Sequence, residues 1–166
     1  MSLERRVDSD RQLARLLQIG IVLEELVEAR AHQHFASLSD PERDALDAGI
    51  VELLEEAAEE SADHRQRLEA LIDTLEADCP PYEEIEALVD AQYGRTKPED
   101  FDGILYDQLH GEETAYKFYD DLIKAIRRSD ARFGIDRDRV IETLLTIREE
   151  EAEGVREVTE LMEERP

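Results

Sequence analysis

Cysteine, glycine and proline are scarce in this chain of 166 residues, and so are long apolar runs. The single cysteine, Cys79, excludes a disulfide framework and any zinc or iron centre that several cysteines would hold. Seven glycines and five prolines leave few positions for turns, which predicts few, long elements. No apolar run approaches the roughly 18 residues of a membrane span, and residues 1–10 lack the apolar core of a signal peptide. We therefore expect a cytoplasmic protein with no membrane partner.

Positive charge is scarce as well. The chain has 20 lysines and arginines against 44 aspartates and glutamates, which gives a formal net charge of −24. This charge excludes a nucleic-acid partner bound through a basic face, because each phosphate contact would form against a negative field. Only three of the basic residues are lysines. An acidic, lysine-poor surface is typical of proteins that stay hydrated in concentrated salt, as in an extreme halophile.

The apolar residues favour a folded, helical chain over a disordered one. High net charge with 5% aromatic residues also fits disorder, but the 41% of apolar residues recur at steps of three and four. Asp40 and Pro41 stop one helix and start the next, and Gly134 and Asp136 mark the last turn. Four long helices are predicted, over residues 9–38, 41–76, 98–128 and 136–163.

The connections between these helices predict their arrangement. The first pair and the last pair are joined by short turns and should form antiparallel hairpins, whereas residues 77–97 form a long crossover with a short helix at 82–93. Such a crossover can return along the bundle and make the second and third helices parallel. One long crossover in a four-helix bundle is the ferritin-like topology. The predicted fold is an all-α, ferritin-like four-helix bundle in a single domain over residues 1–166.

A polar residue interrupts the apolar stripe near the middle of each predicted helix. Glu25, His64, Glu112 and Glu151 fall one to a helix, each at a core-facing position of its stripe. A carboxylate in a core is costly unless it is paired or bound to a metal, because the ion must be desolvated. Three glutamates and a histidine from four helices are ligands that such bundles use for iron or manganese. The sequence therefore predicts a metal site at the bundle centre, with one or two ions of iron or manganese.

The heights of these residues along the helices bear on whether they can meet. Glu112 and Glu151 are about equally far from the predicted turn between their helices, so they should lie at one level. Glu25 and His64 are not equally far from the turn between the first two helices. With the rise per residue of an α-helix, their levels along the bundle would differ by roughly 10 Å. A longer connection between the first two helices, running to Gly49, would remove it.

The abundance of glutamate weakens this signal. With 27 glutamates in the chain, a glutamate on any one stripe is expected by chance. His64 is scarcer, since the chain has four histidines, yet a lone core histidine is more often structural than a ligand. The alternative to a metal site is a degenerate scaffold without metal, which acts as a structural or interaction protein.

Four short segments, one in each predicted helix, carry a resemblance to a known family: Glu25 ten residues before Phe35-Ala36, Glu59-Glu60-Ser61-Ala62-Asp63-His64, Gly111-Glu112 before Tyr116 and Tyr119, and Glu151-Ala152-Glu153-Gly154. They are similar to the ligand motifs of rubrerythrin-type members of the ferritin-like superfamily, and the resemblance covers residues from about 10 to 163. It implies a di-iron site and ferroxidase- or peroxidase-like redox or iron-handling activity.

The chain departs from this family at three positions. Ser61 stands where the family has a bridging glutamate, Gly154 where it has a second histidine, and Ala115 where rubrerythrins have an extra glutamate. The chain also has no Cys-x-x-Cys pairs for the rubredoxin domain that would pass electrons to the site.

The resemblance implies one complete half-site and one incomplete one. In the first, Glu25, His64 and Glu151 would bind one ion. In the second, only Glu112 and the shared Glu151 remain as ligands, and a neighbour such as Glu28, Glu60 or Glu113 would supply the missing one. Glu60 precedes His64 by four residues, a spacing that can chelate, so Glu60 could supply the ligand that is missing at Ser61.

The first predicted helix has a second apolar face, formed by Leu13, Leu16, Leu17, Leu23, Val27 and Leu38. Two apolar faces on one helix exceed what a single bundle core needs. We therefore expect a homodimer through this helix.

Overall fold

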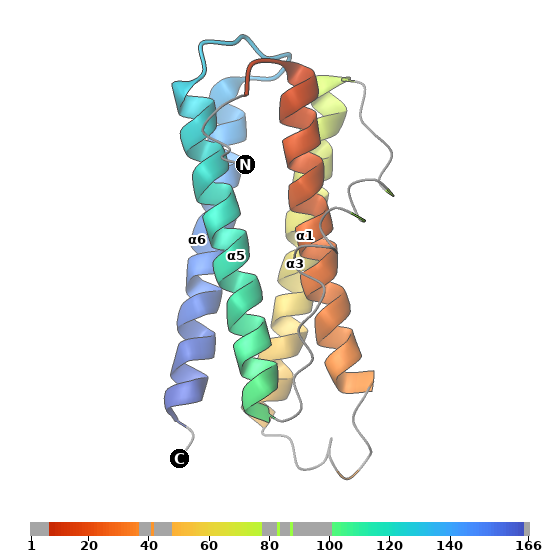
Figure 1. The fold of residues 1–166 in the computed structure, drawn as a ribbon, viewed down its shortest axis with the longest axis vertical. Helices are drawn as coiled ribbons and strands as arrows, with labels where there is room; N and C mark the ends of the chain where they lie inside the picture. The colour runs from red at the N-terminus through yellow and green to blue at the C-terminus, as the bar shows by residue number, and fades with distance from the viewer. Residues whose placement is uncertain are drawn as a thin grey trace.

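The computed structural model describes residues 7–36, 41, 48–77, 83, 87 and 101–164. Four long helices make up most of this described part, and they lie side by side as an all-α bundle (Figure 1). The helices are α1 (Asp10–Ala36), α3 (Ala48–Leu75), α5 (Phe101–Arg128) and α6 (Arg137–Glu163). The prediction of an all-α four-helix bundle is confirmed.

The helices form two hairpins that face each other. Helix α1 packs mainly on α3, and α5 packs mainly on α6, as predicted; α1 also contacts α5, and α3 contacts α6. All four of these neighbouring pairs are antiparallel, whereas α3 and α5 run in the same direction (Figure 1). The predicted crossover lies largely outside the described residues. Glu83 and Ala87 are described there, and both are helical.

Side chains satisfy the free backbone groups at several helix ends. At the start of α1, Ser9 Oγ accepts a hydrogen bond from Gln12 N at 3.2 Å, and Gln12 Oε1 accepts one from Asp8 N at 2.7 Å. The Asp136 side chain accepts one from Asp138 N at the start of α6. Arg137 donates to the carbonyls of Ile126, Ser129 and Ala131, and so caps the end of α5. These caps fix the bounds of the helices.

The segment before α1 is fastened to the turn between α5 and α6. Ser129 Oγ donates to Val7 O at 2.5 Å, and Gly134 N donates to Asp10 Oδ1 at 2.8 Å. A side chain at Gly134 would meet Asp10, because a Cβ there would lie 2.8 Å from its Oδ2. This contact fixes one end of the first hairpin against one end of the second.

Two larger apolar clusters and a small third one, formed by Val22 and Leu23 of α1, make up the core of the described residues. Of the first two, the larger cluster includes Leu17, Leu68 and Leu144, and the smaller one includes Leu54 and Val158. Helices α3, α5 and α6 contribute to both of the larger clusters, and between them each carries a buried polar residue: His64, Glu112 and Glu151. The predicted stripes of α3 and α6 are confirmed at the buried positions that they share with the structure: Ile50, Leu54, Ala57, Ser61, His64, Leu68, Leu71 and Leu75 on α3, and Val140, Leu144, Ile147, Glu151, Gly154 and Val158 on α6.

The face predicted for a dimer is partly used inside the bundle. Leu13 and Leu17 are fully buried in the larger cluster, and Leu23 is also buried. Leu16 and Val27 are half-buried, and Leu38 lies outside the described residues. The homodimer therefore stays a prediction, with a smaller apolar face to support it. In the described residues, no helix is both long and apolar enough to cross a membrane.

Candidate metal centre

Helix α1 brings Glu24 into the bundle centre. Leu13, Leu17 and Ile21 are fully buried at steps of four, and Glu24 is the next residue on that face, with 1% of its surface exposed. Tyr119 of α5, itself fully buried, donates a hydrogen bond from its hydroxyl to Glu24 Oε1 at 2.6 Å. Glu24 Oε2 is buried and has no hydrogen-bond partner. Leaving a buried carboxylate oxygen without a partner costs free energy, so a cation at this atom would be stabilising.

The structure places Glu25 beside this site, not in it. The predicted stripe passed through Val22 to Glu25 and Ala29, but Ala29 is exposed and Glu25 is half-buried. Neighbouring residues of an α-helix point about 100° apart, so a shift of one residue moves the side chain to the next face. The signal for Glu24 was present in the sequence, because the steps from Leu13 and Leu17 through Ile21 lead to it.

His64 of α3 joins three carboxylates. Its side chain is fully buried, and Nδ1 lies 3.2 Å from Glu24 Oε1 and 3.1 Å from Glu151 Oε1. On its other side, Nε2 lies 2.6 Å from Glu150 Oε2. Side chains of α1, α3 and α6 therefore meet at one imidazole. Glu24 of α1 and His64 of α3 lie at the same level along the bundle.

Glu60 and Glu150 form the outer side of the cluster. Glu60 Oε1 lies 3.9 Å from His64 Nε2, from one turn earlier on α3. The Glu60 side chain is 36% exposed and that of Glu150 is 33% exposed, whereas Glu24 and Glu151 are buried. A ligand from solvent would therefore reach the cluster between α3 and α6.

Glu112 of α5 occupies the space that Gly154 of α6 leaves free. A Cβ on Gly154 would lie 2.7 Å from the carboxyl carbon and from Oε2 of Glu112, closer than real Cβ contacts. Gln108, one turn earlier on α5, donates to Glu112 Oε1 at 2.9 Å and holds the carboxylate in place. The absence of a side chain at Gly154 thus makes room for a carboxylate.

The environment favours protons on the buried carboxylates. Burial raises the pKa of Glu151 well above its usual range, and the charges of Glu24 and Glu112 act in the same direction. Burial likewise raises the pKa of Glu112, against the hydrogen bond from Gln108. The pKa of Glu60 rises to about 8, through burial first and then the charge of Glu112. Carboxyl groups crowded in this way share protons unless a cation is present.

The pKa of His64 is raised, although burial of the imidazole by itself would lower it. Burial favours the neutral imidazole, but the hydrogen bond and charge of Glu24, together with the hydrogen bond to Glu150, raise the pKa of His64 to about 9. The imidazolium is then the cation that the cluster holds at neutral pH. A divalent ion would have to displace that proton, since a metal binds only the neutral ring.

Three groups in the described residues have ligand atoms within 4.8 Å of one another and could each hold a metal ion: Glu24 with His64 and Glu151, Glu60 with His64 and Glu150, and Glu60 with Glu112 and Glu151. We call their six members the polar layer: Glu24, Glu60, His64, Glu112, Glu150 and Glu151. Its donors, five carboxylates and one imidazole, suit iron or manganese better than softer metals.

The structure thus brings together three of the four predicted site residues, His64, Glu112 and Glu151. Glu24, and not Glu25, lies in the cluster, and Glu60, which the sequence suggested as a substitute for Ser61, also has a carboxylate oxygen there. Glu150 was not anticipated. It lies next to Glu151 on α6, and a stripe argument chooses only one of two adjacent residues.

Comparison with known proteins gives no assignment: no family model, no curated protein and no solved structure matches this chain. Its function must be inferred from the site.

Proposed function

We propose that this chain is a ferritin-like protein that binds two divalent ions, iron or manganese, in the polar layer. The observation that carries the proposal is the overlap of two ligand groups. Glu24, His64 and Glu151 form one, Glu60, Glu112 and Glu151 form the other, and only Glu151 belongs to both. A glutamate shared by two groups is the arrangement by which one carboxylate bridges two ions.

The charges of these residues support two ions. The two groups contain four carboxylates and one imidazole. Two divalent cations would balance the charge of the four carboxylates if the imidazole is neutral. Glu150 lies outside these two groups and could balance further positive charge. Without metal, protons on His64 and on the buried carboxyl groups serve that purpose.

The direction of the helices supports the ferritin-like part of the proposal. Two hairpins with α3 and α5 running the same way require a connection that returns along the bundle, and residues 76–100 are long enough for it (Figure 1). This is the topology in which inward carboxylates and histidines from four helices hold paired ions.

The chain's own residues would orient the ligands and exclude water. The Tyr119 hydroxyl fixes Glu24, and the Gln108 amide fixes Glu112. Apolar clusters cover the site on both sides along the bundle, so access is from the α3–α6 face, where Glu60 and Glu150 are half-exposed. Iron bound here would supply one-electron redox chemistry with oxygen or peroxide.

Metal content after loading tests the proposal. Purified protein, loaded with ferrous iron or with manganese without oxygen and then desalted, should retain about two ions per chain by elemental analysis. Metal at blank level in a folded protein would contradict the proposal and leave the metal-free scaffold as the function.

A matched pair of variants tests the register of α1. Glu24→Gln removes a carboxylate from the polar layer and should weaken manganese binding at least tenfold, whereas Glu25→Gln should leave the affinity within about twofold. Both variants remove one negative charge from neighbouring positions, so any general effect of charge is the same in each. Equal losses of affinity, or a larger loss with Glu25→Gln, would contradict the assignment of Glu24 to the metal site.

A further inference from the structure

The polar layer contains a third ligand group, which lies on its outer side and is not one of the two groups in the proposed function. Its members are Glu60, His64 and Glu150, whose ligand atoms lie within 4.8 Å of one another. His64 Nε2 lies 2.6 Å from Glu150 Oε2 and 3.9 Å from Glu60 Oε1. We call these three residues the outer group, and the two groups of the proposed function the inner groups.

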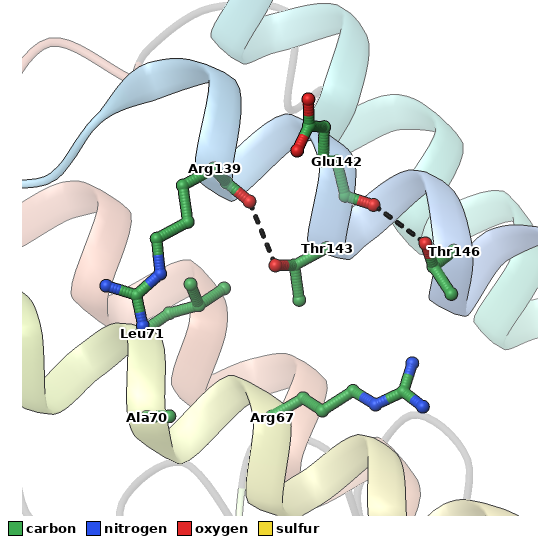
Figure 2. Close-up of a pocket in the computed structure, with 7 residues that line it drawn as sticks. All are labelled: Arg67, Ala70, Leu71, Arg139, Glu142, Thr143 and Thr146. Carbon is green, nitrogen blue, oxygen red and sulfur yellow. Dashed lines mark hydrogen bonds between the residues drawn. The ribbon is translucent and has the colours of Figure 1, made fainter.

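The outer group is the part of the polar layer that solvent reaches. Glu60 and Glu150 are half-exposed, whereas the other four members of the layer are buried. Next to the outer group, an open groove of about 370 Å³ lies between α3 and α6, and its lining includes Arg67 of α3 and Thr146 of α6 (Figure 2). Thr146 is one turn before Glu150, and Arg67 Nη1 lies 3.5 Å from Glu150 Oε1. An ion from solvent therefore meets Glu60 and Glu150 before any buried ligand.

The ring of His64 stands between the outer group and the most deeply buried ligands. Its Nδ1 lies 3.2 Å from Glu24 Oε1 and 3.1 Å from Glu151 Oε1, while its Nε2 is turned to Glu150. On the inner side of the ring, Glu24 Oε2 is buried without a hydrogen-bond partner, and a cation would stabilise it. An ion that reaches this oxygen from the outer group has to pass from one side of His64 to the other.

The outer group and the inner group that contains Glu24 cannot both hold an ion through His64. A neutral imidazole has one nitrogen with a lone pair for a metal, and its other nitrogen carries a hydrogen. An ion on Nε2 therefore excludes an ion on Nδ1. Once Nδ1 holds an ion, the hydrogen on Nε2 can be donated to Glu150, across the 2.6 Å that already separates these two atoms. The outer group thus suits an ion in passage and not a third resident ion.

We propose that the outer group is the entry position through which divalent ions reach the inner groups, an inference that rests on the proposed metal-binding function. Glu60, Glu150 and His64 Nε2 receive the ion first. Glu60 also belongs to the inner group with Glu112 and Glu151, so its carboxylate can stay on the ion while the outer ligands are exchanged for inner ones. His64 is then released, and its Nδ1 becomes available to the other inner group.

A position that is used only in passage changes rates and not affinity. Its ligands stabilise the ion during uptake and during release, but they stabilise neither the free ion nor the ion at rest in the inner groups. Loss of such a ligand therefore slows uptake and release by the same factor. Loss of a ligand to a resident ion acts differently, because it speeds release and weakens binding.

Manganese kinetics in Glu150→Gln test the entry position. Uptake is followed by the loss of the free Mn²⁺ signal in electron paramagnetic resonance of rapidly frozen samples, and release is followed after addition of a chelator. The glutamine keeps an oxygen that accepts the Nε2 hydrogen bond of His64 but lacks the charge that receives an ion. We expect uptake and release both to slow roughly tenfold or more, with about two ions per chain still bound at saturation. Glu149→Gln removes the same charge from an exposed neighbour, 67% exposed, and should leave both rates within about twofold.

Three results would overturn the entry position while leaving the proposed function in place. They are unchanged rates in Glu150→Gln, equal slowing in Glu149→Gln, and faster release with weaker binding in Glu150→Gln, which would make Glu150 a ligand of a resident ion. Absence of Mn²⁺ binding in the unmodified protein would contradict the proposed function and the entry position together.

Discussion

Gly154 shows how one small residue can define the chemistry of a site. Its missing side chain is the space in which the Glu112 carboxylate lies, and Gln108 holds that carboxylate from its other side. In the sequence alone, Gly154 offers no side-chain atom that could bind a metal. In three dimensions it makes room for the carboxylate of Glu112 from α5, so oxygen atoms that could bind a cation lie at this point of the polar layer.

Gly154→Ala should separate metal binding from folding. Its Cβ would displace the carboxylate of Glu112, the far end of a flexible side chain, so the backbone need not move. Alanine is also the better helix former by about 1 kcal/mol. We expect unchanged or slightly higher stability in denaturant without metal, and retention of about one manganese ion in place of two. Glu153→Ala, at an exposed neighbour, is the control and should retain both ions. Full occupancy in Gly154→Ala would show that Glu112 holds no ion.

At the end of α3, the backbone of Glu76 has a conformation that glutamate rarely adopts. Glu76 has a φ of 52°, in the left-handed region that ends many helices but that favours glycine. Leu75 just before it is buried in the larger cluster, so the chain must leave the helix at this point. The predicted end of this helix, at residue 76, is right to within a residue, yet nothing in the residue type of Glu76 indicates a left-handed backbone.

Glu76→Gly should stabilise the protein, whereas the same substitution inside the helix should destabilise it. Relief of the left-handed glutamate is worth about 1 kcal/mol, less the entropy that glycine adds to the unfolded chain. Glu69→Gly, at an exposed interior position of α3, should cost about 1 kcal/mol. Urea unfolding of the metal-free protein measures both. Two losses of similar size would show that Glu76 carries no strain.

The whole molecule should become less stable as the pH rises when no metal is bound. The folded protein raises the pKa of His64 to about 9 and that of Glu60 to about 8, each above the value of the unfolded chain. Their stabilisation is complete below the ordinary pKa of each group and is lost as the pH rises through the raised one. The polar layer then carries uncompensated negative charge inside the bundle.

Urea midpoints of the metal-free protein should therefore fall between pH 6 and pH 9.5 at constant, high salt. Manganese should reduce this fall, because bound ions replace the protons and bind better as those protons leave. A variant such as His64→Gln, which cannot hold the imidazolium proton, should show a shallower decline than the unmodified chain. A midpoint that rose with pH in the metal-free protein would contradict the protonation assigned to the polar layer.

The sequence by itself determined the helices, their pairing and most of the buried stripes, because helical periodicity and hairpin connections are local properties of the chain. It also indicated His64, Glu112 and Glu151, since each interrupts an otherwise apolar stripe. Only the tertiary structure decided between Glu24 and Glu25, because on α1 apolar residues occupy more than one face and the packing of α3 and α5 selects which face turns inward. Packing also brought Glu60 and Glu150 to His64 and placed Glu112 against Gly154. Those contacts join residues from different helices, and in a chain with 27 glutamates no local pattern distinguishes the few that meet from the many that face water.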